Sequence, residues 1–274
     1  MLPFLYHTWI GRLILSILCK PFVSNLAGRF LDSKASIFLV KPFVRKNHID
    51  LSEFESDFHC FNDCFCRKIK PGLRPFSGEG TDLCAPCDGL LSVYRISDQT
   101  VLPVKQSRYT ISSLLNNPEL ADSFTDGLCL VFRLCVNHYH RYAYFDDCTK
   151  GKNIGIPGVL HTVRPIALSQ YPVFTQNSRE YTVMNTKHFK RAVQVEVGAL
   201  LVGKISNLHG AGVFRRGEEK GCFLYGGSTI ILLLEKDSVN LRSDLATAVG
   251  TGEEIPVRMG EVLGRAAGQN GLKK

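Results

Sequence analysis

The first apolar pattern of the chain has the period of an α-helix. Between residues 10 and 18 the apolar positions fall mostly three or four residues apart, with polar residues between them. The apolar members of this face are Ile10, Leu13, Ile14, Ile17 and Leu18. Pro21 is expected to end or kink this helix, and a second helical stretch follows it through Leu31. The pattern predicts a helical N-terminal region over residues 1–75.

The pattern changes beyond the stretch KPGLRPFSGEG at 70–80. From about residue 82, short apolar or alternating runs are separated by Gly, Asn and Asp. These runs cover residues 89–96, 128–136, 191–205, 222–225 and 228–235. Val, Ile, Leu and Tyr dominate them, which is typical of strands. We therefore predict an α+β fold, in which a strand-rich domain, residues 76–274, follows the helical region.

The composition is that of a folded globular chain. Of its 274 residues, 45% are hydrophobic and 21% are charged. The first residues show neither the basic start nor the small-residue cleavage site of a signal peptide. The ten cysteines are therefore expected to be free thiols in a reducing cytosol.

Positive charge is concentrated in the predicted helical region. Residues 1–50 hold seven lysines and arginines against two aspartates, whereas residues 228–274 hold six residues of each sign. A basic, apolar segment favours an anionic surface, either a membrane or a nucleic acid. No apolar run approaches the roughly 18–20 residues that span a bilayer. The first helix is thus expected either to lie in the membrane interface or to pack on the protein's own core.

Two histidines in the sequence HYH form one candidate site. If residues 138–140 are part of a strand, His138 and His140 share one face of it. His161 could then complete a set of metal ligands. No carboxylate lies at an obvious ligand spacing, which favours one functional or buried histidine over a metal site.

The sequence CAPC at 84–87 looks like half of a zinc site. The upstream cysteines, Cys60, Cys64 and Cys66, do not supply a second well-spaced pair, so buried free thiols are the expected state. Asp88 and Gly89, which follow directly, read as a turn into the run at 89–96.

Two glycines, a serine and a threonine precede the apolar part of the run at 228–235. They are Gly226, Gly227, Ser228 and Thr229. Glycine clusters before strands are common, because glycine reaches backbone angles that other residues avoid. By spacing alone this stretch is a turn.

Seven segments, taken in order, resemble the bacterial phosphatidylserine decarboxylase proenzymes. They are FNDCFCRKIKPGLRP (61–75), PCDGLLS (86–92), YHRYAYFDD (139–147), IPGVLHTVRP (156–165), VEVGALLVGKI (195–205), RGEEKGCFLYGGST (216–229) and VRMGEVLG (257–264). No single motif is specific, but seven in collinear order over nearly the whole chain are.

The resemblance implies that the chain cuts itself. Ser228 would attack the carbonyl of Gly227, and the glycines would let the backbone bend for that approach. The products would be a large subunit, 1–227, and a small subunit, 228–274, that begins with a pyruvoyl group made from Ser228. Asp88 of the DG turn and His140 of the YHR motif would be the carboxylate and the base that activate the hydroxyl.

The mature enzyme would use the pyruvoyl group as a built-in electron sink. Phosphatidylserine would form a Schiff base with it, lose CO2 and leave as phosphatidylethanolamine. The basic N-terminal helices would reach this lipid in an anionic membrane, with the protein bound peripherally at the cytoplasmic face of the cell membrane. The resemblance is compatible with a homodimer, and it implies neither a nucleic-acid partner nor a metal.

The histidine pattern departs from that of the family. Many members carry a second histidine where this chain has Ala143. One of two roles, the base of self-cleavage or the proton donor of decarboxylation, therefore needs a substitute. His161 is the first candidate, because the strand carrying it could return beside His140, and His138 is the second.

Other departures are milder. Gly226 replaces a bulky aliphatic residue, and Cys64 and Cys66 replace residues that are usually aromatic and polar. Ala143 also supports a different hypothesis, a non-catalytic lipid-binding homologue. A decarboxylase of a related serine-bearing lipid and a metal enzyme built on the three histidines are further alternatives.

Overall fold

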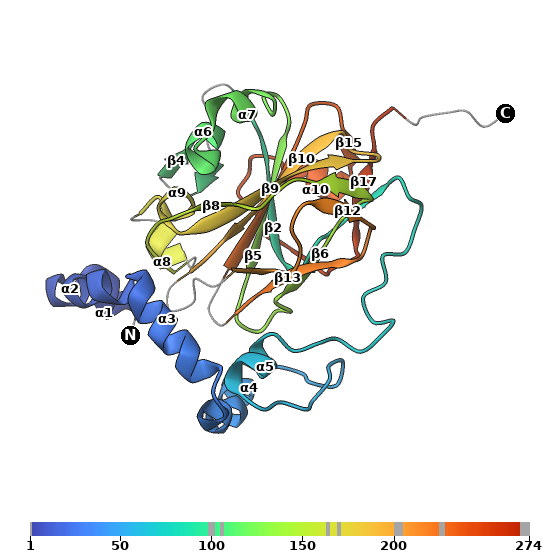
Figure 1. Cartoon of the computed structure of the whole chain (residues 1–274). Coiled ribbons are helices and arrows are strands. Elements are labelled where there is room, and N and C mark those ends of the chain that lie inside the picture. Colours follow the sequence, from blue (N-terminus) through green and yellow to red (C-terminus); the bar gives the residue numbers. More distant parts are fainter. Residues whose placement is uncertain are drawn as a thin grey trace.

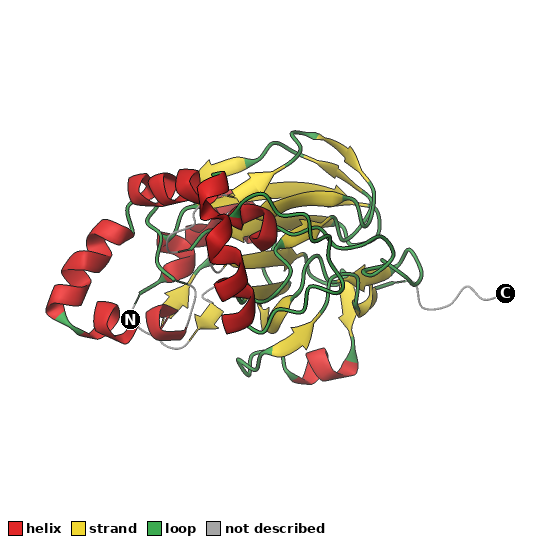
Figure 2. Cartoon of the chain, turned by 90° about the horizontal axis from the view of Figure 1, so that it is seen from below, coloured by secondary structure: helices red, strands yellow, loops and turns green. Residues whose placement is uncertain are grey.

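The computed structural model describes residues 2–97, 102–104, 107–162, 165–168, 171–199, 205–224 and 228–268. Figure 1 shows a strand-rich body with a series of N-terminal helices along one side of it. Figure 2, seen from below, shows most of the helices gathered beside the strands rather than between them. The predicted helical start and strand-rich body are both present.

The N-terminal helices follow the periodicity of the sequence. They are α1 Leu2–His7, α2 Trp9–Leu18, α3 Pro21–Leu31, the 3-10 helix η1 Lys34–Leu39, α4 Val40–Lys46 and α5 Phe61–Phe65. Thr8 caps α2 by accepting a hydrogen bond from the backbone N–H of Gly11 at 3.0 Å. Pro21 begins α3 rather than kinking a longer helix, because the first helical position does not need an N–H donor.

A nine-stranded antiparallel sheet forms the centre of the body. Its main path has the order β12-β7-β9-β10-β14-β5-β2-β16, and β8 pairs with β9. The strands are β2 Gly89–Arg95, β5 Leu128–Leu134, β7 Cys148–Lys150, β8 Ile154–Ile156, β9 Arg179–Thr186, β10 Arg191–Val197, β12 Gly212–Phe214, β14 Ser228–Leu234 and β16 Ile255–Val257. The most apolar runs of the sequence thus form its central strands.

Smaller elements surround this sheet. One three-stranded sheet consists of β1 Asp82–Cys84, β17 Val262–Ala266 and β15 Val239–Leu241, a second of β11 Ile205–Asn207, β13 Glu219–Phe223 and β6 Arg141–Ala143, and a hairpin of β3 Leu102–Val104 and β4 Ser107–Tyr109. Short helices of the body are α6 Ile111–Leu115, α7 Pro118–Asp122, α8 Pro165–Leu168, α9 Val173–Gln176 and α10 Ser243–Thr247. The sequence pattern does not predict these helices, because four or five residues are too few to show a helical period.

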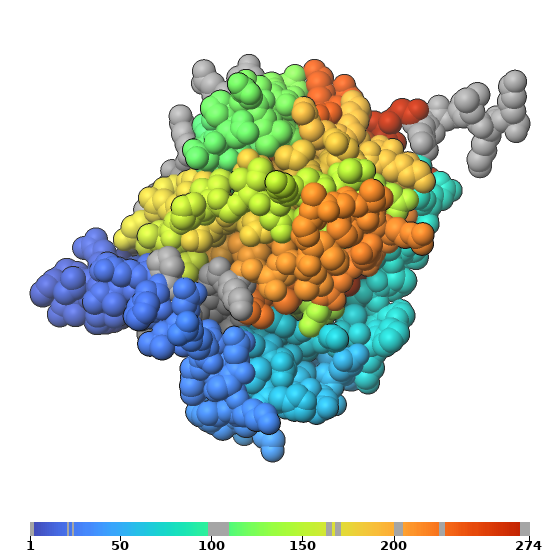
Figure 3. Space-filling view, in the orientation of Figure 1, coloured from blue at the N-terminus to red at the C-terminus, as the bar shows by residue number. Residues whose placement is uncertain are grey.

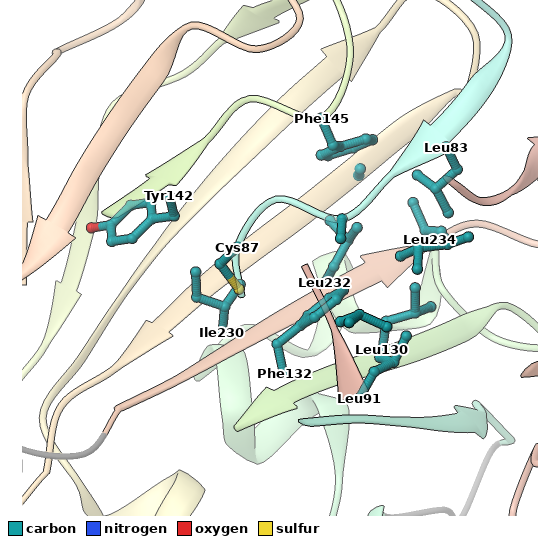
Figure 4. Packing of buried hydrophobic residues seen from close by; sticks show 14 of the residues in the cluster. Leu83, Cys87, Leu91, Leu130, Phe132, Tyr142, Phe145, Ile230, Leu232 and Leu234 are labelled. Carbon is teal, nitrogen blue, oxygen red and sulfur yellow. The ribbon is translucent and has the colours of Figure 1, made fainter. Parts of the chain in front are cut away.

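Both faces of the central sheet are buried. Side chains of β14 alternate, so that Ile230, Leu232 and Leu234 pack in one apolar cluster. Ile231 and Leu233 pack in the cluster on the opposite face. Figure 4 shows the first cluster, where side chains of β2, β5 and β14 pack together. Each buried side chain of this size contributes about 1.5–3 kcal/mol, which holds β14 firmly in place.

Only a narrow face of the N-terminal helices belongs to the core. Leu15 of α2 packs with Leu5 and Tyr6 in the second cluster. The face that the periodicity selects points away from the body, since Leu13 and Ile17 are 61% and 54% exposed. Figure 3 shows these helices projecting from the body. Within the described ranges, no helix is both long enough and apolar enough to cross a membrane.

A buried ion pair joins the central sheet to the β11-β13-β6 sheet. Lys220 of β13 and Glu196 of β10 are both fully buried, and Lys220 Nζ lies 2.6 Å from Glu196 Oε1. Lys220 Nζ also donates to Asn207 Oδ1 at 2.9 Å, and Gln194 Nε2 donates to Glu196 Oε1 at 2.9 Å. Both charges are therefore matched by partners inside the protein.

Candidate active site

Ser228 is the first residue of β14 and lies opposite Leu134, the last residue of β5. Its side chain is 2% exposed, and its hydroxyl has no hydrogen-bond partner among the described residues. An unpartnered buried hydroxyl costs about 1–3 kcal/mol, so its presence points to a chemical role. Gly226 and Gly227, which precede Ser228 in the predicted cleavage motif, lie outside the described residues.

Sheet pairing places Ser228 in the layer between the central sheet and the β11-β13-β6 sheet. Its neighbour Leu134 packs in the cluster that contains Tyr142 and Phe223 of the smaller sheet, and directly opposed residues share one face. His140 immediately precedes β6, and its carbonyl accepts a hydrogen bond from the N–H of Phe223 at 3.0 Å. The backbone of His140 is thus fixed to β13, whose Phe223 packs in the same cluster as Leu134, the neighbour of Ser228.

The ring of His140 is fully buried and stacks obliquely on Phe65, with centroids 4.1 Å apart. Its Nδ1 lies 3.0 Å from the carbonyl oxygen of His138. A carbonyl only accepts, so Nδ1 carries the proton and Nε2 holds a lone pair. Nε2 has no partner among the described residues. Burial lowers the pKa of His140 to about 3, so the ring is neutral and able to accept a proton at Nε2.

His138 has the opposite tautomer. Its Nδ1 accepts a hydrogen bond from the backbone N–H of Cys135 at 3.1 Å, so the proton of the neutral ring is on Nε2. Burial lowers the pKa of His138, and the nearby carboxylate of Asp88 opposes this effect. The prediction that residues 138–140 are part of a strand is wrong, because His138 lies in a bend before β6 begins at Arg141.

Asp88 lies at the start of β2 and is fixed by a cation and a backbone amide. Arg74 donates to both carboxylate oxygens at 3.3 Å, and the N–H of Met259 donates to Oδ1 at 2.8 Å. Asp88 and His138 line one cavity of about 450 Å³. The structure therefore brings Asp88 to His138, and no contact among the described residues joins Asp88 to His140.

Arg67 is a site residue that sequence reasoning missed. It is 1% exposed, and its Nη2 donates to the carbonyls of Asn137 and His138 at 2.9 and 3.0 Å. Its guanidinium carbon lies 4.4 Å from the centre of the Phe54 ring. Arg67 thus holds the bend that carries His138, and its charge lowers the pKa of both histidines. Arg67 and Arg74 both lie in the segment 61–75, whose resemblance to the family was the sequence feature that could have identified them as site residues.

His161 lies in different surroundings. Its ring stacks on Tyr171 with centroids 4.3 Å apart, and its Nδ1 lies 3.3 Å from the hydroxyl of Tyr6. Its backbone N–H donates to Asn177 Oδ1 at 2.9 Å. In the part of the chain that the structure describes, no contact brings it beside His140, so the expected return of its segment to that histidine is not seen.

The metal hypotheses find no support in the geometry. No group of three or more His, Cys, Asp or Glu side chains is placed to hold a metal ion within the described ranges. All ten cysteines are free thiols, and nine of them are buried, as predicted. Ala143 is buried, and its N–H donates to the carbonyl of Pro86 at 2.9 Å, which ties β6 to the segment before Asp88.

Comparison with known proteins gives a consistent result. Residues 61–265 match the family model described as phosphatidylserine decarboxylase. The chain is 42% identical to phosphatidylserine decarboxylase proenzyme 2 of Clostridium acetobutylicum, over 96% of this chain and 91% of that protein. It is 38% identical to the phosphatidylserine decarboxylase proenzymes of Clostridium novyi and Ruminiclostridium cellulolyticum, over 96% of this chain and 92% and 90% of theirs.

Proposed function

The chain belongs to the phosphatidylserine decarboxylase family, and on that premise we propose that it cuts itself between Gly227 and Ser228 and then converts phosphatidylserine to phosphatidylethanolamine. The products of the cut are a large subunit, 1–227, and a small subunit, 228–274. The observation that carries the proposal is that two buried atoms, Ser228 Oγ and His140 Nε2, have no hydrogen-bond partner among the described residues.

Self-cleavage begins at the Ser228 hydroxyl. Its oxygen attacks the carbonyl carbon of Gly227, and its proton passes to Nε2 of His140. His140 then gives this proton to the amide nitrogen, which leaves as an amine. An ester now joins the two residues. Loss of the Ser228 α-proton then expels the Gly227 carboxylate and leaves a carbon–carbon double bond. Addition of water releases ammonia and leaves a pyruvoyl group on the small subunit.

The position of Ser228 fits this group, because its hydroxyl makes no hydrogen bond with any described residue that conversion would break. The pyruvoyl carbonyl supplies an electron sink for the electrons that CO2 leaves behind. We assign the return of a proton to carbon to Nε2–H of His138. Asp88 favours the protonated imidazole, and Arg74 holds Asp88 in the shared cavity.

Intact mass of the purified protein tests the proposal. We expect two chains that meet at Gly227 and Ser228, the smaller one lighter by one ammonia than a fragment that begins with serine. Ser228→Ala should remain a single chain and release no CO2, because it lacks the attacking oxygen. A single uncut wild-type chain would favour the non-catalytic lipid-binding homologue, for which Ala143 is the supporting residue. CO2 release from a related serine-bearing lipid in preference to phosphatidylserine would change the substrate but not the mechanism.

We also propose that the outer face of the N-terminal helices lies in an anionic membrane surface, at the cytoplasmic face of the cell membrane. This face exposes apolar side chains that the body does not cover: Trp9 72%, Leu13 61%, Ile17 54%, Phe22 75%, Leu26 61% and Phe38 65%. Exposed basic residues flank them: Arg12, Lys20, Arg29, Lys34 and Lys41. Such a combination favours burial of the apolar face at the level of the lipid headgroups.

A further inference from the structure

Two cysteines far apart in the sequence meet beside the candidate active site. Cys66 ends α5, and Cys222 is part of β13. Both are buried in one small apolar cluster and line the same cavity, and each thiol affects the pKa of the other. Cys66 Sγ also donates to the carbonyl of Phe223 at 2.9 Å. The two sulfurs are therefore held together by contacts from two separate elements.

A cation lies beside this pair of thiols. Cys222 is paired with Arg141 across β13 and β6, and Arg141 Nε donates to the carbonyl of Cys66 at 2.8 Å. The thiol of Cys66 and the charge of Arg141 lower the pKa of Cys222. By contrast, burial raises the pKa of Cys64 to about 11. Cys222 is thus the better nucleophile, and Cys66 is the neighbouring thiol that can react with Cys222 after its oxidation.

Small molecules have a route to the pair. Cys66, Cys222 and Arg141 line a cavity of about 390 Å³, and Asn62 and Lys68 also line it. The cavity is large enough for hydrogen peroxide and for the water that its reduction would release.

We propose that Cys66 and Cys222 form a peroxide-sensitive dithiol. The Cys222 thiolate attacks one oxygen of hydrogen peroxide, and the other oxygen leaves as hydroxide. The Cys66 sulfur then attacks the Cys222 sulfenic acid, and the sulfur–sulfur bond forms as that oxygen leaves as water. The proton of Cys66 goes to that leaving oxygen, and the proton that Cys222 released on ionising neutralises the hydroxide, so two thiols lose two electrons and one peroxide becomes two waters.

The disulfide would alter the strand that leads to Ser228. It removes the thiol that donates to the Phe223 carbonyl, and the N–H of Phe223 is the group that binds the His140 carbonyl. Loss of one such hydrogen bond corresponds to about 1.4 kcal/mol, or about tenfold in a rate. Because the base of self-cleavage is assigned to His140, we expect oxidation of the uncut protein to slow self-cleavage by about that factor and a dithiol reductant to restore it.

Peptide mapping of the full-length protein tests the site without relying on activity. After treatment with hydrogen peroxide and alkylation of the remaining thiols, we expect a peptide pair joined through Cys66 and Cys222 that disappears on reduction. Cys222→Ser should abolish the pair, and Cys66→Ser should leave a sulfenic acid on Cys222 that dimedone traps. Cys129→Ser, which removes a fully buried thiol from another cluster, should leave the pair intact.

Each outcome has a separate meaning. Oxidation of other cysteines before Cys222, or no joined peptide, would overturn the proposed site. A joined peptide with an unchanged rate of self-cleavage would overturn only the effect on the active site. A reduced protein that neither cuts itself nor releases CO2 would contradict the proposed function and leave the dithiol standing.

Discussion

Two buried polar regions lie along the same central sheet, and they differ in how their polar atoms are matched. Around Lys220 and Glu196 both charges are paired and receive further hydrogen bonds, and the atom there without a partner in the described part of the chain is the uncharged amide oxygen of Gln194. Around Ser228 and His140, the hydroxyl and Nε2 have no partner among the described residues. A matched region stabilises the fold, whereas unmatched groups retain their reactivity. The difference separates a structural polar cluster from a chemical one without reference to any relative.

Removing each imidazole should give the largest effects and should separate the two histidines. We expect His140→Ala to slow self-cleavage by about 10²–10⁴-fold, because the proton of Ser228 loses its acceptor. We expect His138→Ala to be cut normally but to release CO2 more slowly by a similar factor. Gel analysis of processing and a CO2 assay on the same samples measure both.

If His138→Ala blocked self-cleavage and His140→Ala slowed only CO2 release, the roles of base and proton donor would be exchanged between the two histidines. His161→Ala serves as the matched control, because this residue stacks on Tyr171 in different surroundings. Normal cutting with lost CO2 release in His161→Ala, and not in His138→Ala, would transfer the donor role to His161.

Removing the buried ion pair between Lys220 and Glu196 should instead destabilise the fold. Lys220→Met leaves the Glu196 carboxylate buried without its cation, and we expect the free energy of unfolding to fall by about 3–5 kcal/mol. Urea unfolding at pH 7 measures this change. Adding Glu196→Leu should recover most of the loss, because no unpaired charge then remains. A single variant as stable as the wild type would contradict the contrast between the two regions.

The unmatched imidazole should also make stability depend on pH. The pKa of His140 is about 3 in the folded protein and about 6.5 when unfolded. Between these values the unfolded chain binds a proton that the folded chain does not, so stability falls as the pH decreases below about 6.5. At pH 5 the loss from His140 is about 2 kcal/mol. Urea unfolding of Ser228→Ala at pH 7 and pH 5, with and without His140→Gln, isolates this contribution; equal losses would show that His140 does not cause it.

The smallest expected effect concerns the apolar side chains on the outer face of α2, which are exposed to water. Trp9 is the one tryptophan of the sequence, and it is 72% exposed. We expect its fluorescence to shift to shorter wavelength with vesicles that contain anionic lipid, and less with neutral ones. Leu13→Glu should weaken this response. An unchanged spectrum with anionic vesicles would argue against a membrane-bound α2.

The sequence predicts the central strands well because their apolar runs are long and end at turn residues. It predicts the helices at 9–18 and 21–31 because their apolar residues recur at helical spacing, but it leaves open whether the apolar face of α2 packs inward. Leu15 packs inward while Leu13 faces solvent, since periodicity shows that two faces differ and not which one the body covers.

The candidate site shows the same limit. Ser228 and His140 are found from motifs, but the tautomer of each histidine depends on backbone contacts from Cys135 and His138. Those contacts come from a bend whose shape is set by Arg67. Neither the bend nor the pairing of Asp88 with Arg74 has a signature in local spacing.

The place of β14 has a consequence for the two proposed subunits. It pairs with β10 on one side and with β5 on the other. The later strands β15 and β16 lie beside β17 and β2, and β17 also pairs with β1. A cut before Ser228 would therefore break the backbone, but the two subunits would stay associated. The small subunit would still contribute a central strand, β14, to the sheet formed mainly by the large subunit. Neither piece would have a complete sheet alone, so the mature enzyme would have to be folded before it is divided.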